Sequence, residues 1–157
     1  MNLFLINLLL AVGFMVVLES FTLQTLIIGF AIGYGALWLT RPLYPNTRYF
    51  RRFFETIRLL TFFIKALFIS NLRVLWDVVT PGHISRPGII RLPLDARTDL
   101  EIMLVANLIS LTPGTLSVDL SEDRSYLYVH VMFLDNVDAT CRELKEGLEQ
   151  RVLEVLR

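Results

Sequence analysis

"LISLTPGTLSVD", residues Leu108 to Asp119, decides the fold of the second half of this chain. Its first half is typical of a helix end, and its second half alternates in the way that a strand does. Pro113 disfavours helical geometry in the residue before it, and Gly114 readily adopts a positive φ. The stretch therefore predicts a tight corner at which a helix passes into a strand. The residues of this turn are Leu111, Thr112, Pro113, Gly114 and Thr115.

A strand and the start of a helix precede the corner. Residues 89–94 alternate, and Pro93 favours an edge position or a bulge because proline cannot donate to a strand ladder. Thr98 and Glu101 have the spacing of a capping box, so a helix is expected to begin at Asp99. The expected inward residues of the strand are Ile90, Leu92 and Leu94. The apolar residues that recur at helical spacing are Leu100, Met103, Leu104, Leu108 and Leu111.

Two further strands and a last helix follow the corner. Residues 116–120 and 126–131 alternate on either side of the polar turn 121–125, which predicts a hairpin. Residues 138–157 have the period of a helix. Its expected inward residues are Leu144, Leu148, Val152 and Val155 or Leu156; those of the hairpin are Leu116, Val118, Leu120, Leu127, Val129 and Val131. The order β-α-β-β-α predicts a small α+β domain with two helices over one face of its sheet.

Three alternating residues of the second hairpin strand, 126–131, define a candidate interface. Tyr126, Tyr128 and His130 are expected on the sheet face opposite the core. Their expected neighbours are Arg91, Ser117 and Asp119. The tyrosines are either ordinary strand-forming residues or anchors for a partner. His130 is a hypothetical pH sensor, because histidine titrates near neutral pH.

The first forty residues are strongly apolar and predict a membrane anchor. Between Asn2 and Leu39 the only side chain that is charged at neutral pH is Glu19. One helix over that range would be about 57 Å long, nearly twice the bilayer hydrocarbon thickness of about 30 Å. We therefore predict a transmembrane α-helical hairpin over 1–40, with spans at 3–18 and 21–39. The segment lacks a basic n-region and a cleavage pattern, so we expect it to be retained.

Two features of this hairpin are candidates for function. Gly29, Gly33 and Gly35 belong to small-xxx-small patterns that let another helix approach closely, and that helix is either the first span or another subunit. Glu19 is a weak ion-path candidate, since a carboxylate within a bilayer can relay protons. We favour a solvated carboxylate at the hairpin tip, because the hairpin has no second acidic or basic side chain to relay a proton.

A basic loop and an amphipathic helix occupy residues 41–80. The arginines near the second span outnumber the one acid, Glu55, and place this segment and the N-terminus in the cytoplasm. These arginines are Arg41, Arg48, Arg51, Arg52 and Arg58. Polar residues form a stripe along 51–80, which favours a helix in the membrane interface over a third span. Residues 81–88 are a linker to a cytoplasmic soluble domain at 89–157.

These segments together resemble the E subunit of the bacterial Mrp-type multisubunit Na+/H+ antiporter, also called Mnh, Pha or Sha. The most specific part is Asn-Leu-Ile-Ser-Leu-Thr-Pro-Gly-Thr at 107–115, followed by Tyr-Val-His at 128–130. The resemblance covers the whole chain in length and order. It implies a cytoplasmic-membrane complex of several subunits that exchanges cytoplasmic Na+ for external protons. It also implies that large antiporter-like subunits hold the proton path and that this chain is an accessory member.

The sequence indicates no reaction centre or cofactor. Cys141 is the only cysteine, and His83 and His130 lie in different elements, so a metal site is not expected. The net charge is zero and argues against nucleic acid as a partner. We expect an accessory structural subunit, not an enzyme, whose partners are other membrane subunits and lipid, without a small-molecule substrate of its own. The alternative is a stand-alone membrane-anchored adaptor for a soluble protein.

Overall fold

The computed structural model describes residues 3–44, 48–82 and 84–157, with the side chain of Arg48 outside the description. His83 is not among the described residues. The chain forms two compact units, Met1–Phe53 and Phe54–Arg157. The boundary between these units falls inside the long helix α3 (Arg48–Val79).

Two apolar helices form most of the N-terminal unit. They are α1 (Leu3–Val17) and α2 (Leu23–Leu39), and the short 3-10 turn η1 (Arg41–Leu43) follows them. The helices lie antiparallel, because Gly29 approaches the backbone of Ala11 while Gly33 approaches Asn7. Small residues at these positions let the two backbones come close together.

The break between α1 and α2 has a local cause. Glu19 has a positive φ of 49°, which ends the first helix. The Thr22 side chain then accepts a hydrogen bond from the backbone N–H of Thr25 at 3.2 Å. This side-chain cap makes α2 begin at Leu23, two residues after the position expected for the second span.

Helix length separates α3 from the two shorter helices. With 15 and 17 residues, α1 and α2 are about 22 and 25 Å long, less than the hydrocarbon thickness of about 30 Å. Among the described residues, one helix, Tyr49–Val79, is long and apolar enough to cross a membrane by length and composition.

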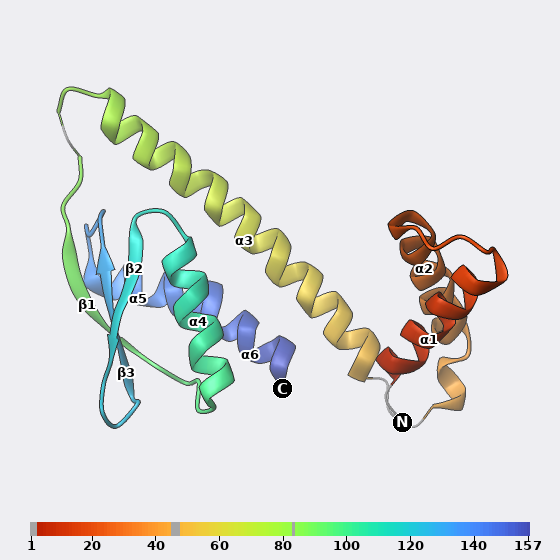
Figure 1. Cartoon of the computed structure of the whole chain (residues 1–157). Coiled ribbons are helices and arrows are strands. Elements are labelled where there is room, and N and C mark those ends of the chain that lie inside the picture. Colours follow the sequence, from red (N-terminus) through yellow and green to blue (C-terminus); the bar gives the residue numbers. More distant parts are fainter. Residues whose placement is uncertain (1–2, 45–47, 83) are drawn as a thin grey trace. The chain divides into compact units, whose positions relative to one another are not determined.

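An antiparallel three-stranded sheet organises the C-terminal unit. Its strands are β1 (Gly88–Pro93), β2 (Thr115–Leu120) and β3 (Tyr126–Val131), in the spatial order β1-β3-β2 (Figure 1). The helices are α4 (Asp99–Leu111), α5 (Val137–Leu144) and α6 (Gln150–Leu156), with the π-type turn η2 (Lys145–Glu149) between the last two. The predicted strand-helix-strand-strand-helix order is confirmed, and Pro93 lies on an edge strand as expected.

One hydrophobic core lies between this sheet and the helices. Its buried residues are Ile90, Leu92, Val105, Ile109, Leu127, Val129, Val131, Leu144, Leu148 and Val152. The strand members of this set alternate along β1 and β3 and so share one face of the sheet. Helix α4 and the C-terminal helices therefore cover the same face. On the other face Tyr126, Tyr128 and His130 are half-buried, and Ile89 and Leu116 are exposed.

The inward face of α4 differs from the prediction. Ile102, Val105 and Ile109 are buried, whereas Leu100 and Met103 are about half exposed. Apolar residues lie on nearly all sides of α4, so their spacing does not select one face. The capping box contributes to the choice, because the buried Glu101 has to reach its partners on the same side as Ile102 and Val105.

The predicted capping box of Thr98 and Glu101 is present, and Glu101 also forms an ion pair with Arg157. The Glu101 carboxylate accepts from the backbone N–H groups of Arg97 and Thr98 at 2.8 and 3.1 Å, and from Arg157 Nε at 3.0 Å. Arg157 and then these amides lower the pKa of Glu101 from its ordinary 4.5 to about 2. The folded chain therefore favours the ionised form of the Glu101 carboxyl group, and ionisation of Glu101 stabilises the fold. This stabilisation is present above about pH 4.5 and is lost as the pH falls towards 2.

Helix α3 packs against the π-type turn inside the C-terminal unit. A Cβ on Gly147 would lie 2.9 Å from Phe62 Cζ, so the absence of a side chain at Gly147 admits the ring. The guanidinium of Arg151 lies 4.4 Å from the centre of the same ring. Leu59 and Phe63 also contact the core. This part of α3 is therefore an integral element of the C-terminal unit.

Candidate interaction surface

The open face of the sheet is the candidate functional site. Tyr126, Tyr128 and His130 alternate along β3 with its buried residues, so they lie on this face. His130 pairs with Ile89 on one side and with Leu116 on the other. The next row of this surface consists of Arg91, Tyr128 and Asp119. The term open face is used below for Ile89, Arg91, Leu116, Tyr126, Tyr128 and His130.

A β-bulge in β2 changes which residues reach this face. The pairing shifts between Ser117, which is opposite Val129, and Asp119, which is opposite Tyr128. Leu116 and Val118 were expected in the core, but they are 52% and 54% exposed. Leu116 precedes the bulge and pairs with His130, and the bulge reverses the alternation only after Ser117, so that Leu116 and Leu120 lie on opposite faces. The inward expectation for Leu116 and Val118 is therefore wrong.

Ser117 lies on the opposite side from the predicted interface. Its hydroxyl donates to the backbone carbonyl of Ala106 at 2.9 Å, and its backbone N–H donates to Ser110 Oγ at 3.0 Å. Both partners belong to α4, which covers the core side of the sheet. The expectation that Ser117 neighbours the tyrosines is therefore wrong, whereas Arg91 and Asp119 do lie beside them.

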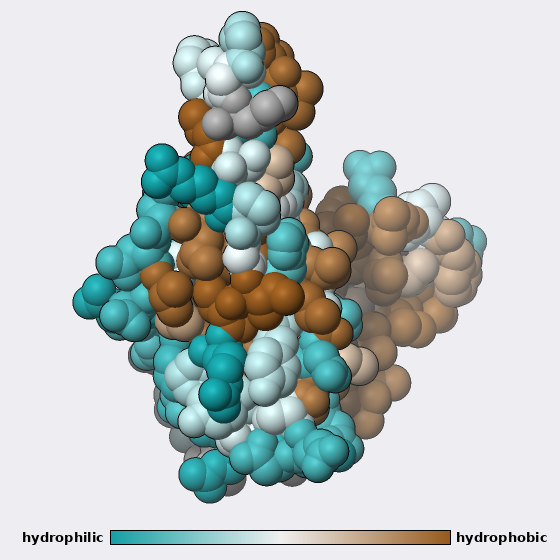
Figure 2. Space-filling model, turned by 90° about the vertical axis from the view of Figure 1, so that its left-hand side faces the viewer, coloured by the Kyte–Doolittle hydropathy of each residue, from teal (hydrophilic) through white to brown (hydrophobic). Residues whose placement is uncertain are grey.

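Exposed apolar and polar side chains lie next to each other on the open face. Figure 2 shows a hydrophobic belt above a paler, more polar area. Ile89 is 64% exposed, and Arg91 lies over the ring of Tyr126 at 4.5 Å. An exposed apolar centre beside tyrosine and arginine is the composition found in protein interfaces. The open face is therefore suited to a protein partner.

The edges of the sheet are less available than its face. Lys145 Nζ donates to the carbonyl of Pro93 at 3.2 Å, and the bulge interrupts the ladder of β2.

The thiol of Cys141 lies 3.8 Å from the carbonyl of Arg91. Burial, together with nearby Asp138, raises the pKa of this thiol, which disfavours the reactive thiolate. Cys141 therefore covers a strand edge and is a poor nucleophile.

Hydrogen bonds within the chain account for most of the predicted corner motif. Gly114 has a φ of 87°, and its carbonyl accepts from Met132 N at 2.7 Å. The Thr115 hydroxyl donates to the carbonyls of Ile109 and Thr112 at 2.6 and 3.0 Å. Thr112 ends α4, Pro113 is half-buried, and Leu111 is 61% exposed. The exposed Leu111 side chain is the part of the motif most available to a partner.

The three predicted helix-packing glycines have different surroundings. A Cβ on Gly29 would lie 3.0 Å from the carbonyl oxygen of Ala11, and one on Gly33 would overlap the side chain of Asn7. A Cβ on Gly35 would meet no atom within 4 Å among the described residues. Gly29 and Gly33 therefore pack against α1, and Gly35 lies on an outer surface of the N-terminal unit.

Asn7 is a fully buried polar residue of α1 that no sequence motif marks. Its side-chain N–H donates to the hydroxyl of Tyr49 at 2.8 Å, while its Oδ1 has no partner among the described residues. Leu3, Asn7 and Ala11 are buried at intervals of four residues, which marks one face of α1. This spacing is the signal by which Asn7 could have been found.

Glu19 lies in the exposed turn between α1 and α2. The described parts of these two helices contain no other Asp, Glu, Lys, Arg or His residue. Its ion-path role stays a prediction. Among the described residues, no group of three His, Cys, Asp or Glu side chains could hold a metal ion, and His83 lies outside this description.

These features define a class of protein: a chain in which strongly apolar N-terminal helices precede a small α+β fold. A family model described as Na+/H+ ion antiporter subunit matches residues 7–155, and the chain belongs to this family. It is 36% identical over 153 residues to the E subunit of the Na(+)/H(+) antiporter of Alkalihalophilus pseudofirmus, covering 98% of this chain and 97% of the relative. The corresponding protein of Bacillus subtilis is 33% identical with the same coverage. The predicted resemblance to the E subunit is confirmed.

Two solved membrane complexes contain similar chains. A chain of the Mrp complex from Dietzia sp. DQ12-45-1b is 28% identical, with a TM-score of 0.50, and the match covers 65% of this chain and 96% of that chain. A chain of the membrane-bound sulfane sulfur reductase, an archaeal respiratory membrane complex, has a TM-score of 0.58 at 21% identity. This second match covers 93% of this chain and 96% of that chain, and it concerns the fold alone.

Proposed function

We propose that this chain is an accessory structural subunit of a multisubunit monovalent cation/proton antiporter in the bacterial cytoplasmic membrane. The observation that carries this proposal is the agreement with relatives that are antiporter E subunits along 98% of the chain. The protein supports assembly and cation exchange and does not carry the ion path alone.

Three buried carboxylates support a structural role. Asp77 Oδ1 accepts from the backbone N–H groups of Ile84 and Ser85 at 2.6 and 3.0 Å. Glu149 Oε1 and the carboxylate of Glu101 also accept from backbone N–H groups. Carboxylates bound to backbone amides hold loops and helix ends in place. A cation path would instead need carboxylates directed towards an ion.

The open face is the proposed docking surface for another subunit. Its exposed apolar residues, Ile89 and Leu116, lie beside His130, while Arg91 and the tyrosines supply polar contacts. Burial of Tyr and Arg side chains contributes strongly to many protein interfaces. Gly35 offers a second, smaller approach surface, suited to a transmembrane helix of a partner subunit.

The proposed topology has two crossings and a cytoplasmic α+β domain, with α3 in the membrane interface. Support comes from the contacts of Leu59, Phe62 and Phe63 with the core of the C-terminal unit. Lipid cannot surround a helix segment that is packed in this way. Arg58 and Lys65 of α3 are exposed, and an interfacial position leaves such charges in contact with water and headgroups.

Isolation of the intact complex tests the assignment. We expect an affinity-tagged version of this chain, produced with its companion subunits and gently solubilised, to be recovered with several different membrane subunits in native mass spectra. Vesicles that lack this chain are expected to show reduced Na+/H+ exchange, and the chain reconstituted alone should show none. Recovery alone, or with a soluble protein only, would instead support a stand-alone adaptor.

Cysteine labelling tests the topology. In a Cys141→Ser background, we expect Glu122→Cys to react with a membrane-impermeant maleimide only after cells are permeabilised, because Glu122 is exposed in the β2–β3 turn. Glu122 is preferable to Ser121, whose hydroxyl accepts from Tyr126 N at 2.9 Å. The matched control, Glu19→Cys, should react in intact cells. Labelling of Glu122→Cys in intact cells would show that α3 crosses the membrane.

A further inference from the structure

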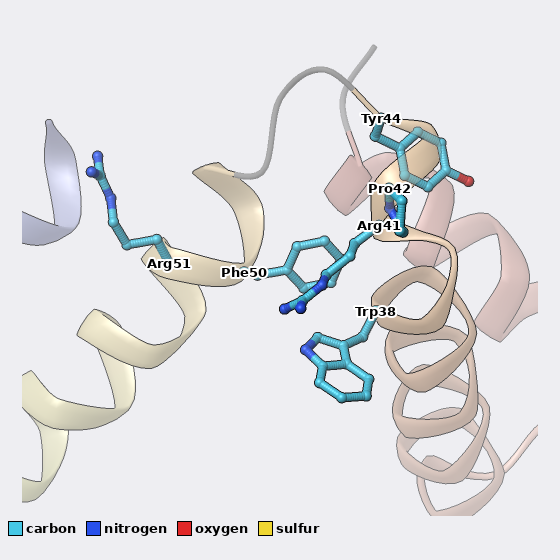
Figure 3. Close-up of a pocket in the computed structure, with 6 residues that line it drawn as sticks. All are labelled: Trp38, Arg41, Pro42, Tyr44, Phe50 and Arg51. Atoms are coloured by element: carbon cyan, nitrogen blue, oxygen red, sulfur yellow. The ribbon is translucent and has the colours of Figure 1, made fainter.

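An open pocket of about 580 Å³ lies at the C-terminal end of α2. Its lining residues, all within the N-terminal unit, are Trp38, Arg41, Pro42, Tyr44, Phe50 and Arg51. Figure 3 shows the guanidinium of Arg41 directed between the rings of Phe50 and Trp38, whereas the side chain of Arg51 extends away. This volume is in the range of sites that hold small ligands or headgroups.

The charged residues that line this pocket, Arg41 and Arg51, are both positive. Residues 41–53 contain four arginines and no Asp or Glu. Arg41 lies 5.3 Å from the ring centre of Trp38, and neither Arg41 nor Arg51 forms an ion pair with any described residue. Guanidinium groups without acidic partners, beside a cavity, are suited to bind a phosphate. Arg51 is exposed, and its long side chain can turn towards a bound anion.

Helix geometry leaves Arg41 available to a ligand. The last carbonyls of α2 carry a partial negative charge that attracts a nearby cation. Two of these carbonyls already have a hydrogen-bond donor, because the Thr40 hydroxyl donates to the carbonyls of Ala36 and Leu37 at 2.8 and 3.3 Å. The guanidinium of Arg41 is directed to the aromatic rings instead of these carbonyls.

The aromatic residues place the pocket at the depth of lipid headgroups. Trp38 lies in the last turn of the apolar helix α2 and is 49% exposed, and Tyr44, shortly after the helix, is half-buried. Trp and Tyr concentrate where hydrocarbon meets headgroup, and basic pockets at cytoplasmic membrane surfaces bind phosphate headgroups. A lipid whose acyl chains lie along α2 would present its phosphate at this level.

We propose that this pocket binds the phosphate headgroup of an anionic phospholipid through Arg41 and Arg51, with Trp38 against the upper part of the lipid. The proposal depends on the membrane position of α2 in the proposed function, but it is independent of cation exchange. A bound lipid would hold the end of α2 and the start of α3 at the bilayer surface.

Trp38 provides a local probe of this site. The chain has two tryptophans, so Trp76→Phe leaves Trp38 as the single reporter in the full chain. In nanodiscs, we expect brominated phosphatidylglycerol to quench Trp38 fluorescence about threefold more strongly than brominated phosphatidylcholine at equal mole fraction. Arg51→Gln is expected to reduce the relative affinity for phosphatidylglycerol about fivefold, since a basic residue at the membrane surface contributes about that factor.

Matched variants separate this pocket from a general basic surface. Arg58→Gln removes the same charge from α3 outside the pocket and should keep the preference, and Arg41→Lys should keep part of it. Loss of the preference in Arg58→Gln, or its retention in an Arg41→Gln/Arg51→Gln double variant with unchanged circular dichroism, would overturn the proposal.

Two comparisons identify which assumption has failed. Equal quenching by both lipids would overturn headgroup binding while leaving the membrane position of α2 intact. Absence of quenching by either lipid would show that α2 lies outside the bilayer. Millimolar inorganic phosphate should leave the quenching unchanged; if it abolished the preference, the pocket would be a site for a free anion and not for a lipid.

Discussion

Replacement of Glu149 by alanine is expected to lower the free energy of unfolding by about 3 kcal/mol. Glu149 is 1% exposed, and its Oε1 accepts from the backbone N–H groups of Asp95 and Ala96 at 2.6 and 2.9 Å. The alanine variant would leave both amides without these bonds; the bond from Ala96 is buried and that from Asp95 is half-buried, and an unsatisfied buried amide costs about 1–3 kcal/mol. Thermal unfolding of the detergent-solubilised chain, followed by circular dichroism, measures the effect.

Glu149→Gln is the matched control for this prediction. Glutamine retains the oxygen that accepts from the two amides and removes a buried charge. The second carboxylate oxygen of Glu149 has no hydrogen-bond partner among the described residues, so no known bond is lost there. We expect the glutamine variant to unfold within about 1 kcal/mol of the parent chain. An equal loss in both variants would contradict the prediction that this pair of hydrogen bonds stabilises the loop.

The double variant Ile89→Glu/Leu116→Glu is expected to weaken association with the other subunits by at least about tenfold. The two side chains flank His130 on the open face and are 64% and 52% exposed, so the fold does not require them to be apolar. In an interface, two unpaired carboxylates would lose hydration without compensation. The measurement is the yield of companion subunits recovered with the tagged chain, relative to the parent.

Leu100→Glu/Met103→Glu provides the control for this surface. Both residues lie on α4, away from the sheet face, and their exposures of 52% and 53% match those of the test pair. We expect this variant to recover companion subunits at the parental level. Retained association of the open-face variant, or an equal loss in the control, would refute docking through the open face. Unchanged thermal unfolding of both variants is needed to exclude misfolding as the cause.

The part of the fold that was predicted correctly depends on short-range signals. The capping box of Thr98 and Glu101 and the positive φ of Gly114 involve residues within a few positions of each other. The C-terminal helix was expected to bury Leu144, Leu148 and Val152, and it does. The π-type turn within that helix was not predicted, because its cause includes the approach of Phe62 to Gly147.

The candidate site was predicted only in part, for a similar reason. The alternation of β3 correctly separated Tyr126, Tyr128 and His130 from the buried residues of the strand. The bulge in β2 depends on its pairing with β3 and has no clear mark in the sequence. Leu116 was consequently assigned to the core, although its exposure makes it a principal residue of the open face.

The sequence by itself determined the apolar helices, the helix-to-strand corner, the order of helices and strands along the C-terminal part of the chain, and the resemblance to antiporter E subunits. These features follow from periodicity and from the backbone preferences of Pro, Gly and capping residues, which act locally. Only the tertiary structure decided which apolar side chains stay exposed, which carboxylates bind backbone amides, and where the Arg41 pocket lies. Each of these depends on contacts between residues distant in sequence, and such contacts form only when the chain is folded.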